Sequence, residues 1–139
     1  MDEDSWTQRL PEVSFRVEEL EHKYWDGLDL AIHFSRALDE SEVATFERVF
    51  SAWYTVGAHG GFGRRSSYSK GVMHNVFELE NRLDDDAAVV AFRADMGSAS
   101  FDALAALARC LEGLKLLDVP VAKLVLGRSE EVPRLRIKE

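Results

Sequence analysis

The chain has 139 residues, of which 46% are hydrophobic and 30% charged, and this is the size and composition of one globular domain. The formal net charge is −8, which argues against nucleic acid as a direct ligand and against an anionic membrane surface, because both require a dense set of Lys and Arg. One cysteine excludes an internal disulfide, and the four histidines are too scattered for a zinc signature, so we expect no metal and no cofactor.

The amino terminus lacks the basic and apolar regions of a secretory signal, and no apolar run reaches the roughly 20 residues that span a bilayer. We therefore expect a cytoplasmic protein without membrane contact. We treat residues 1–139 as a single domain, in which residues 1–12 and 128–139 are flexible or peripheral ends.

Residues 13–20 alternate apolar and polar side chains as a strand does, yet Val13, Val17 and Leu20 also fit one helical face, so both assignments stay open. The clearest strand covers residues 28–34, where every second side chain is apolar. Asp39 followed by Glu42 has the spacing of a capping box and predicts a helix that ends near Gly57.

Two alternating segments, residues 72–83 and 87–96, flank an acidic turn at residues 84–86 and predict a hairpin whose register stays open by one residue. Ser98 or Ser100 is predicted to cap a second helix, with apolar side chains at helical spacing from Phe101 to Leu114. Residues 121–127 predict a last short strand.

The order strand, helix, strand, strand, helix, strand is that of the split βαβ arrangement in ferredoxin-like domains. We therefore expect an α+β fold of the βαββαβ type, with an antiparallel sheet, two helices on one face and a possible extra N-terminal strand.

Charge is divided unevenly along the chain. Residues 48–77 contain no Asp or Glu and carry +4, whereas the other 109 residues carry −12. The basic window includes a glycine-rich loop in which backbone amides can cradle an anion. Its candidate anion-binding residues are Gly60, Gly61, Gly63, Arg64, Arg65 and Lys70. The loop matches neither phosphate-binding glycine motif and follows a helix rather than a strand, so a mobile surface connection is the competing interpretation.

The acidic excess predicts a partner-binding surface on the open face of the sheet and on the acidic turn. Its candidate residues are Asp29, His33, Glu78, Glu80, Asp84, Asp85 and Asp86. Close approach of His33, His74 and Glu78 would allow a metal or a shared proton, although a solvated polar face is commoner. Two groups of aromatic side chains are candidate anchors for a partner. They are Trp6, Tyr24 and Trp25 near the start, and Tyr54, Phe62 and Tyr68 around the glycine-rich loop.

No serine lies in a nucleophile elbow and the paired carboxylates lie in polar runs, so no catalytic residue is predicted. In overall character, as a small, acidic, single-domain chain, the protein resembles bacterial immunity proteins. The resemblance implies a non-catalytic protein-binding module that covers the basic site of a cognate toxin with an acidic surface. We expect a monomer or a weak homodimer. The alternative is a small-molecule or anion-binding enzyme or sensor that uses the glycine-rich loop.

Overall fold

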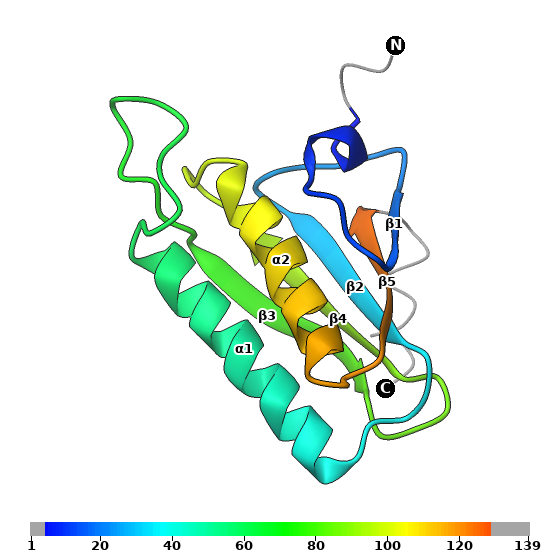
Figure 1. Cartoon of the computed structure of the whole chain (residues 1–139). Helices are drawn as coiled ribbons and strands as arrows, with labels where there is room; N and C mark the ends of the chain where they lie inside the picture. Colours follow the sequence, from blue (N-terminus) through cyan, green and yellow to red (C-terminus); the bar gives the residue numbers. More distant parts are fainter. Residues whose placement is uncertain (1–4, 129–139) are drawn as a thin grey trace.

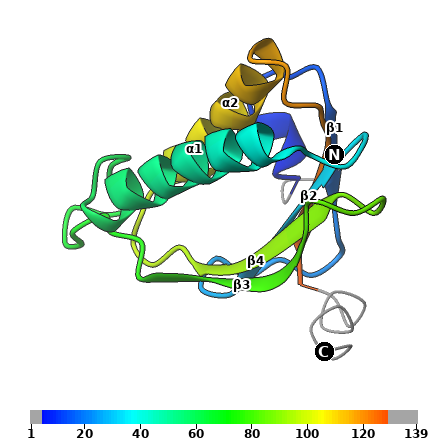
Figure 2. The same ribbon diagram turned by 90° about the horizontal axis from the view of Figure 1, so that it is seen from below.

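The computed structural model describes residues 5–128, which form one five-stranded mixed sheet and two helices that cover one of its faces (Figures 1 and 2). The elements in chain order are η1 (Thr7–Arg9), β1 (Arg16–Glu19), β2 (Leu28–Phe34), α1 (Glu40–Ala58), β3 (Asn75–Arg82), β4 (Val89–Asp95), α2 (Asp102–Leu116) and β5 (Val121–Gly127). The expected peripheral ends lie partly outside the described residues. Of the described part, Trp6 and Leu10 pack against the core.

The strands lie in the order β1-β5-β2-β4-β3. Neighbours from β5 to β3 are antiparallel, but β1 is parallel to β5, so the expectation of an antiparallel sheet is wrong for that edge. The α+β expectation is confirmed, and the arrangement is compatible with a ferredoxin-like fold. The five-strand order is not that of the four-stranded ferredoxin-like sheet, because β1 lies outside β5. Of the segment from residue 13 to residue 24, whose assignment the sequence leaves open, Arg16–Glu19 form a strand and no residue is helical. Val17 packs on the core while Arg16 is exposed.

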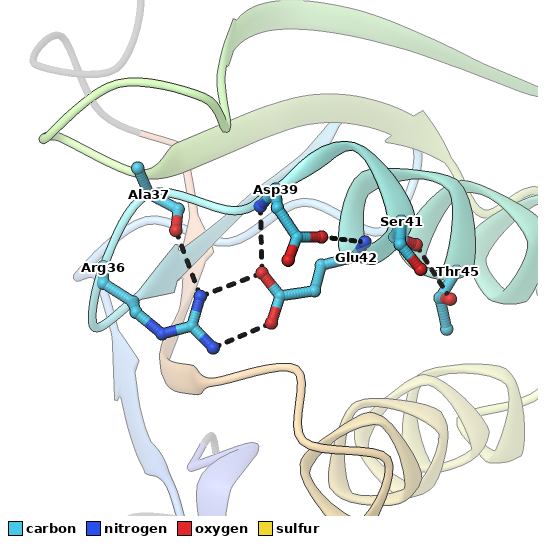
Figure 3. Close-up of polar contacts among 6 residues, drawn as sticks. All are labelled: Arg36, Ala37, Asp39, Ser41, Glu42 and Thr45. Atoms are coloured by element: carbon cyan, nitrogen blue, oxygen red, sulfur yellow. Dashed lines mark hydrogen bonds and ion pairs between the residues drawn. The ribbon is translucent and has the colours of Figure 1, made fainter.

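The start of α1 is the capping box that the sequence predicts (Figure 3). The Asp39 side chain accepts a hydrogen bond from the Glu42 amide, and the Glu42 side chain accepts one from the Asp39 amide. Two hydrogen bonds from Arg36, of 2.8 and 2.7 Å, hold the Glu42 carboxylate from the other side. These bonds, with that of Asp39, lower the pKa of Glu42 to about 2.

The core lies between the helices and the sheet. Phe46, Phe50 and Trp53 of α1 are buried, as their helical spacing predicts, and the Phe50 ring stacks on Phe92 of β4 with centroids 4.1 Å apart. The Trp53 indole donates a 2.8 Å hydrogen bond to the carbonyl of Ala103, which joins α1 to the first turn of α2. Helix α1 is therefore attached both to the sheet and to α2.

The opposite face of the sheet is not wholly solvated. Ala31, Leu79 and Ala91 form a small buried cluster there. Beside it, Asp29 is only 2% exposed and receives two hydrogen bonds from Arg93, with N to O distances of 2.6 and 2.9 Å. Asp29 is thus a structural residue, and the expectation that it meets a partner is wrong because its carboxylate is buried and already paired.

Replacing Asp29 by Ala leaves the largely buried Arg93 guanidinium without its partner. We expect the free energy of unfolding to fall by about 3 kcal/mol. The double variant Asp29→Val with Arg93→Leu removes both charges and should lose less than the single variant. Urea denaturation followed by circular dichroism measures both. A double variant as unstable as Asp29→Ala would show that the loss does not come from an unpaired Arg93 charge.

Candidate functional site

The predicted acidic sheet face is divided by a bulge in β3. The register shifts between Glu78 and Glu80, so Glu78 lies opposite Phe92 on the helix side and Glu80 lies opposite Ala91 on the open side. Strict alternation would place both on one face, and the extra residue Leu79 breaks that alternation. The expectation that Glu78 shares a face with His33 and Glu80 is therefore wrong.

The histidines do not come together. His33 lies opposite Val89 at the start of β4, whereas the His74 amide bonds to Asp95 at its end, about 20 Å away at the usual rise of a strand. No group of three metal-ligating side chains occurs within residues 5–128. His33 is half-buried, and burial together with the charge of Lys123 lowers the pKa of its imidazole.

The open face carries balanced charge rather than excess carboxylate. The strand registers place side chains of both signs there. The cations are Arg16, Arg82, Arg93 and Lys123, and the anions are Glu18, Asp29, Glu80 and Asp95. This face offers no net attraction for a basic partner.

Carboxylates instead gather at one end of the molecule, where the start of α1 meets the β3–β4 turn through the hydrogen bond from the Leu38 amide to the Leu83 carbonyl. We call this the acidic end. It comprises Asp39, Glu40, Glu42, Glu47, Glu78, Asp84, Asp85 and Asp86, with Arg36, Arg48 and Arg82 as its cations.

The carboxylates of the acidic end differ in their roles. Asp85 bonds to Arg82 and to the amides of Ala87 and Ala88, so it shapes the turn. Glu47 and Glu78 line a shallow groove of about 110 Å³ between α1 and β3. Within residues 5–128 neither of them forms an ion pair.

Residues of the glycine-rich loop, the start of α2 and the segment around η1 line a larger pocket of about 430 Å³. Figure 1 shows these three segments at the end of the molecule opposite to the start of α1. We call this pocket the arginine–aromatic pocket. It is lined by Trp6, Arg9, Trp25, Arg64, Arg65, Ser100 and Phe101. Of the predicted loop residues, Arg64 and Arg65 line it, whereas Gly60, Gly61, Gly63 and Lys70 do not.

The glycine-rich loop is attached to the segment before α2. The Arg65 amide donates to the Ser98 carbonyl, Arg64 forms a β-bridge with Ala99, and the Ser100 amide donates to the Gly63 carbonyl. The part of the loop that carries the two arginines is therefore bonded to this segment at three consecutive residues.

A glycine is required at the base of this loop. Gly71 has φ +73°, and a Cβ there would lie 2.7 Å from the Gly63 carbonyl oxygen. The two ends of the loop can approach this closely only without a side chain.

The predicted caps of α2 have different tasks in the structure. Phe101 is the N-cap residue and makes no side-chain capping bond. The Ser98 hydroxyl accepts hydrogen bonds from the amides of Gly71 and Val72. The Ser100 hydroxyl donates a hydrogen bond to the Phe62 carbonyl and accepts one from the Asp102 amide. Both serines thus hold the loop, and the Ser100 hydroxyl is not placed as a nucleophile.

The aromatic wall of the pocket is formed by three rings. Trp25 stacks on Phe101 with centroids 6.0 Å apart, and Trp6 meets both rings edge-on. The Trp25 indole donates to the Ala99 carbonyl at 3.0 Å, and the Arg9 guanidinium lies 3.9 Å above the Phe101 ring. The rings therefore have fixed places within the wall.

Glu19 positions the segment that carries Trp6 and Arg9. Its carboxylate accepts hydrogen bonds from Ser5 and from the amides of Trp6 and Thr7, and lies 3.0 Å from the Lys23 ammonium. Burial by itself would raise the pKa of Glu19, but the bonds from Thr7, Lys23 and Trp6 outweigh it and lower the pKa to about 2.

The sequence marks Arg64 and Arg65 as residues of the glycine-rich loop and Trp6 and Trp25 as candidate anchors for a partner. It does not indicate that these four residues line the same pocket. Sequence reasoning also misses Arg9, Ser100 and Phe101 as site residues. No local pattern marks these three, since the pocket exists only where segments distant in the chain meet.

Replacing Glu19 by Gln should loosen the segment around η1. Because the folded pKa lies below the ordinary value of 4.5, this carboxylate stabilises the fold at neutral pH and ceases to do so as the pH falls from about 4.5 to 2. We expect Glu19→Gln to cost about 1 kcal/mol at pH 7 and almost nothing at pH 2. Urea unfolding at both pH values measures this, with exposed Glu21→Gln as the matched control. An equal loss at both pH values would contradict the assignment.

No protein-family model, no curated protein and no solved structure matches this chain. In the part of the chain from residue 5 to residue 128, no helix is both long enough and apolar enough to cross a membrane. The comparisons therefore transfer no ligand or activity to this chain.

Proposed function

We propose that this chain is a binding protein for a small organic anion, which the arginine–aromatic pocket holds. We also propose that β2 to β5 with the two helices form a ferredoxin-like core, extended by β1. The pocket lies at one end of that core, beside the first residues of α2.

The observation that supports the proposal is the presence of three arginines in the lining of one pocket. Arg9, Arg64 and Arg65 come from two distant parts of the chain, and the residues between 5 and 128 that line the pocket include no carboxylate. None of the three forms an ion pair within residues 5–128. Like charges repel one another, so an anion bound among them would relieve repulsion and gain charge-assisted hydrogen bonds.

Binding fits the pocket better than catalysis does. A general acid or base must lie within hydrogen-bond reach of a reacting group, and the described residues that line the pocket include no His, Asp, Glu or Cys. Arginine remains protonated at any physiological pH, so the three guanidinium groups can hold an anion but do not exchange protons with it.

The variant Arg64→Gln with Arg65→Gln should weaken binding of pyrophosphate, used as a simple anion probe, at least tenfold. A loss of about 1.4 kcal/mol corresponds to that factor, and each guanidinium contact to an anion contributes on this scale. Isothermal titration calorimetry at low salt measures the affinity.

The matched control is Arg48→Gln with Arg109→Gln, which removes the same charge from two exposed helical positions outside the pocket. The control should bind almost as the natural chain does. An equal loss in the control would show that the loss of affinity comes from net charge alone. Failure of the natural chain to bind pyrophosphate or any other small anion at millimolar concentration would refute the proposal.

The acidic end supports a second candidate function, the immunity-type inhibitor. Carboxylates from α1, β3 and the β3–β4 turn meet there, and their summed charge would attract the basic substrate site of a toxin and speed association. The proposed surface for the basic partner is therefore the acidic end and not the open sheet face.

Neutralising Glu47, Glu78, Asp84 and Asp86 to their amides should slow association with a basic partner and flatten its dependence on salt. The partner is captured from native cells with the tagged natural chain and identified by mass spectrometry. Association rates of the purified partner are then measured at several ionic strengths. The control neutralises four exposed carboxylates outside the acidic end, Glu12, Glu21, Asp26 and Asp102. Equal slowing in both variants would exclude the acidic end as the binding surface.

A further inference from the structure

We infer that the arginine–aromatic pocket takes a ligand of the mononucleotide class, in which a planar aromatic ring is joined to a phosphate group. The inference rests on the proposed function and adds to it the identity of the ligand's two parts.

The pocket has an aromatic half as well as a cationic half. Trp6, Trp25 and Phe101 are each only partly buried, and all three line the same hollow. A site for an inorganic anion requires donors and charge but no ring surface. Three aromatic side chains in one pocket are what a ligand with a flat apolar part requires.

The rings are in place before a ligand arrives. Trp25 is held by its hydrogen bond to Ala99 and by stacking on Phe101, and Trp6 meets both rings edge-on. A preformed ring surface saves the cost of ordering side chains on binding. Stacking on such surfaces is tolerant of the particular base, because every base has a flat face.

The cationic half fits a phosphate better than a carboxylate. One guanidinium satisfies a carboxylate through two parallel hydrogen bonds, whereas a phosphate monoester carries about two negative charges and three terminal oxygens. Three arginines line the pocket, which is more than the one guanidinium that a carboxylate requires. Arg9 joins the halves, since its guanidinium lies over the Phe101 ring at 3.9 Å.

The dimensions favour a single nucleotide over a polymer. A volume of about 430 Å³ lies within the range of small-molecule pockets, roughly 300 to 1,000 Å³. A nucleic-acid strand requires cations along a continuous groove, whereas the chain as a whole carries −8 and the carboxylate of Asp102 follows directly after Phe101.

Tryptophan fluorescence tests the inference, because Trp6 and Trp25 line the pocket while Trp53 is buried in the core. The probes are AMP, GMP, adenosine, pyrophosphate, benzoate and a single-stranded decanucleotide. We expect AMP and GMP to change the fluorescence and to bind at least tenfold more tightly than adenosine, pyrophosphate or benzoate, with the decanucleotide no tighter than AMP.

Two variants separate the contribution of the ring from that of the charge. Trp6→Leu should lower the affinity for AMP at least fivefold and change the affinity for pyrophosphate less than twofold. Arg9→Met should lower the affinity for AMP at least fivefold without affecting folding, because Arg9 is exposed. The matched control is Tyr68→Leu, an aromatic residue of the same loop that is 98% exposed and outside the pocket. Calorimetry follows binding to Trp6→Leu, and circular dichroism confirms that each variant is folded.

Four results would overturn the inference. If pyrophosphate binds as tightly as AMP and its affinity falls in Arg64→Gln/Arg65→Gln, the proposed function stands but the ligand needs no aromatic ring. If benzoate binds as tightly as AMP, the ligand needs no phosphate group. A decanucleotide at least a hundredfold tighter than AMP would indicate a nucleic-acid site. Failure of every anionic probe to bind would refute the inference and the proposed function together.

Discussion

The short connection between β4 and α2 holds together the end of the molecule that contains the arginine–aromatic pocket. The Met96 amide donates to the Trp25 carbonyl, the Ala99 carbonyl accepts the Trp25 indole, and the Ser98 carbonyl accepts the Arg65 amide. Backbone groups at this depth require partners. Two of these bonds attach Trp25 to the connection, and the third attaches the glycine-rich loop. The aromatic wall and the glycine-rich loop are therefore both attached to the connection between β4 and α2, and the pocket forms between them.

The two charged ends of the molecule are separated along α1. This helix has 19 residues and spans about 28 Å, with the acidic end at its start and the glycine-rich loop after its last turn. Glu40 and Glu42 in the first turn also interact favourably with the helix dipole. Because charges are screened over about 8 Å at physiological salt, the two ends act as independent surfaces. An anion in the pocket and a basic partner at the acidic end would not exclude each other by charge.

Most of the elements follow from local patterns. The capping box of Asp39 and Glu42, the hairpin around the acidic turn and the apolar stripe of α2 depend on neighbours within one or two turns, and their prediction is confirmed. The same reasoning fails for the pair Glu78 and Glu80, because the bulge between them places these two side chains on opposite faces of the sheet. It also fails at Asp29, since a carboxylate in an alternating strand gives no sign of an arginine 64 residues further on.

The sequence by itself determined the α+β class, the positions of the helices and strands, and the presence of a basic glycine-rich segment in an acidic chain. Only the tertiary structure decided the parallel pairing of β1, the balanced charge of the open sheet face and the meeting of Trp6, Trp25 and Phe101 with Arg64 and Arg65. The physical reason is the range of the forces involved. Periodicity and capping act between residues close in the chain, whereas a pocket or a buried ion pair depends on where distant segments pack.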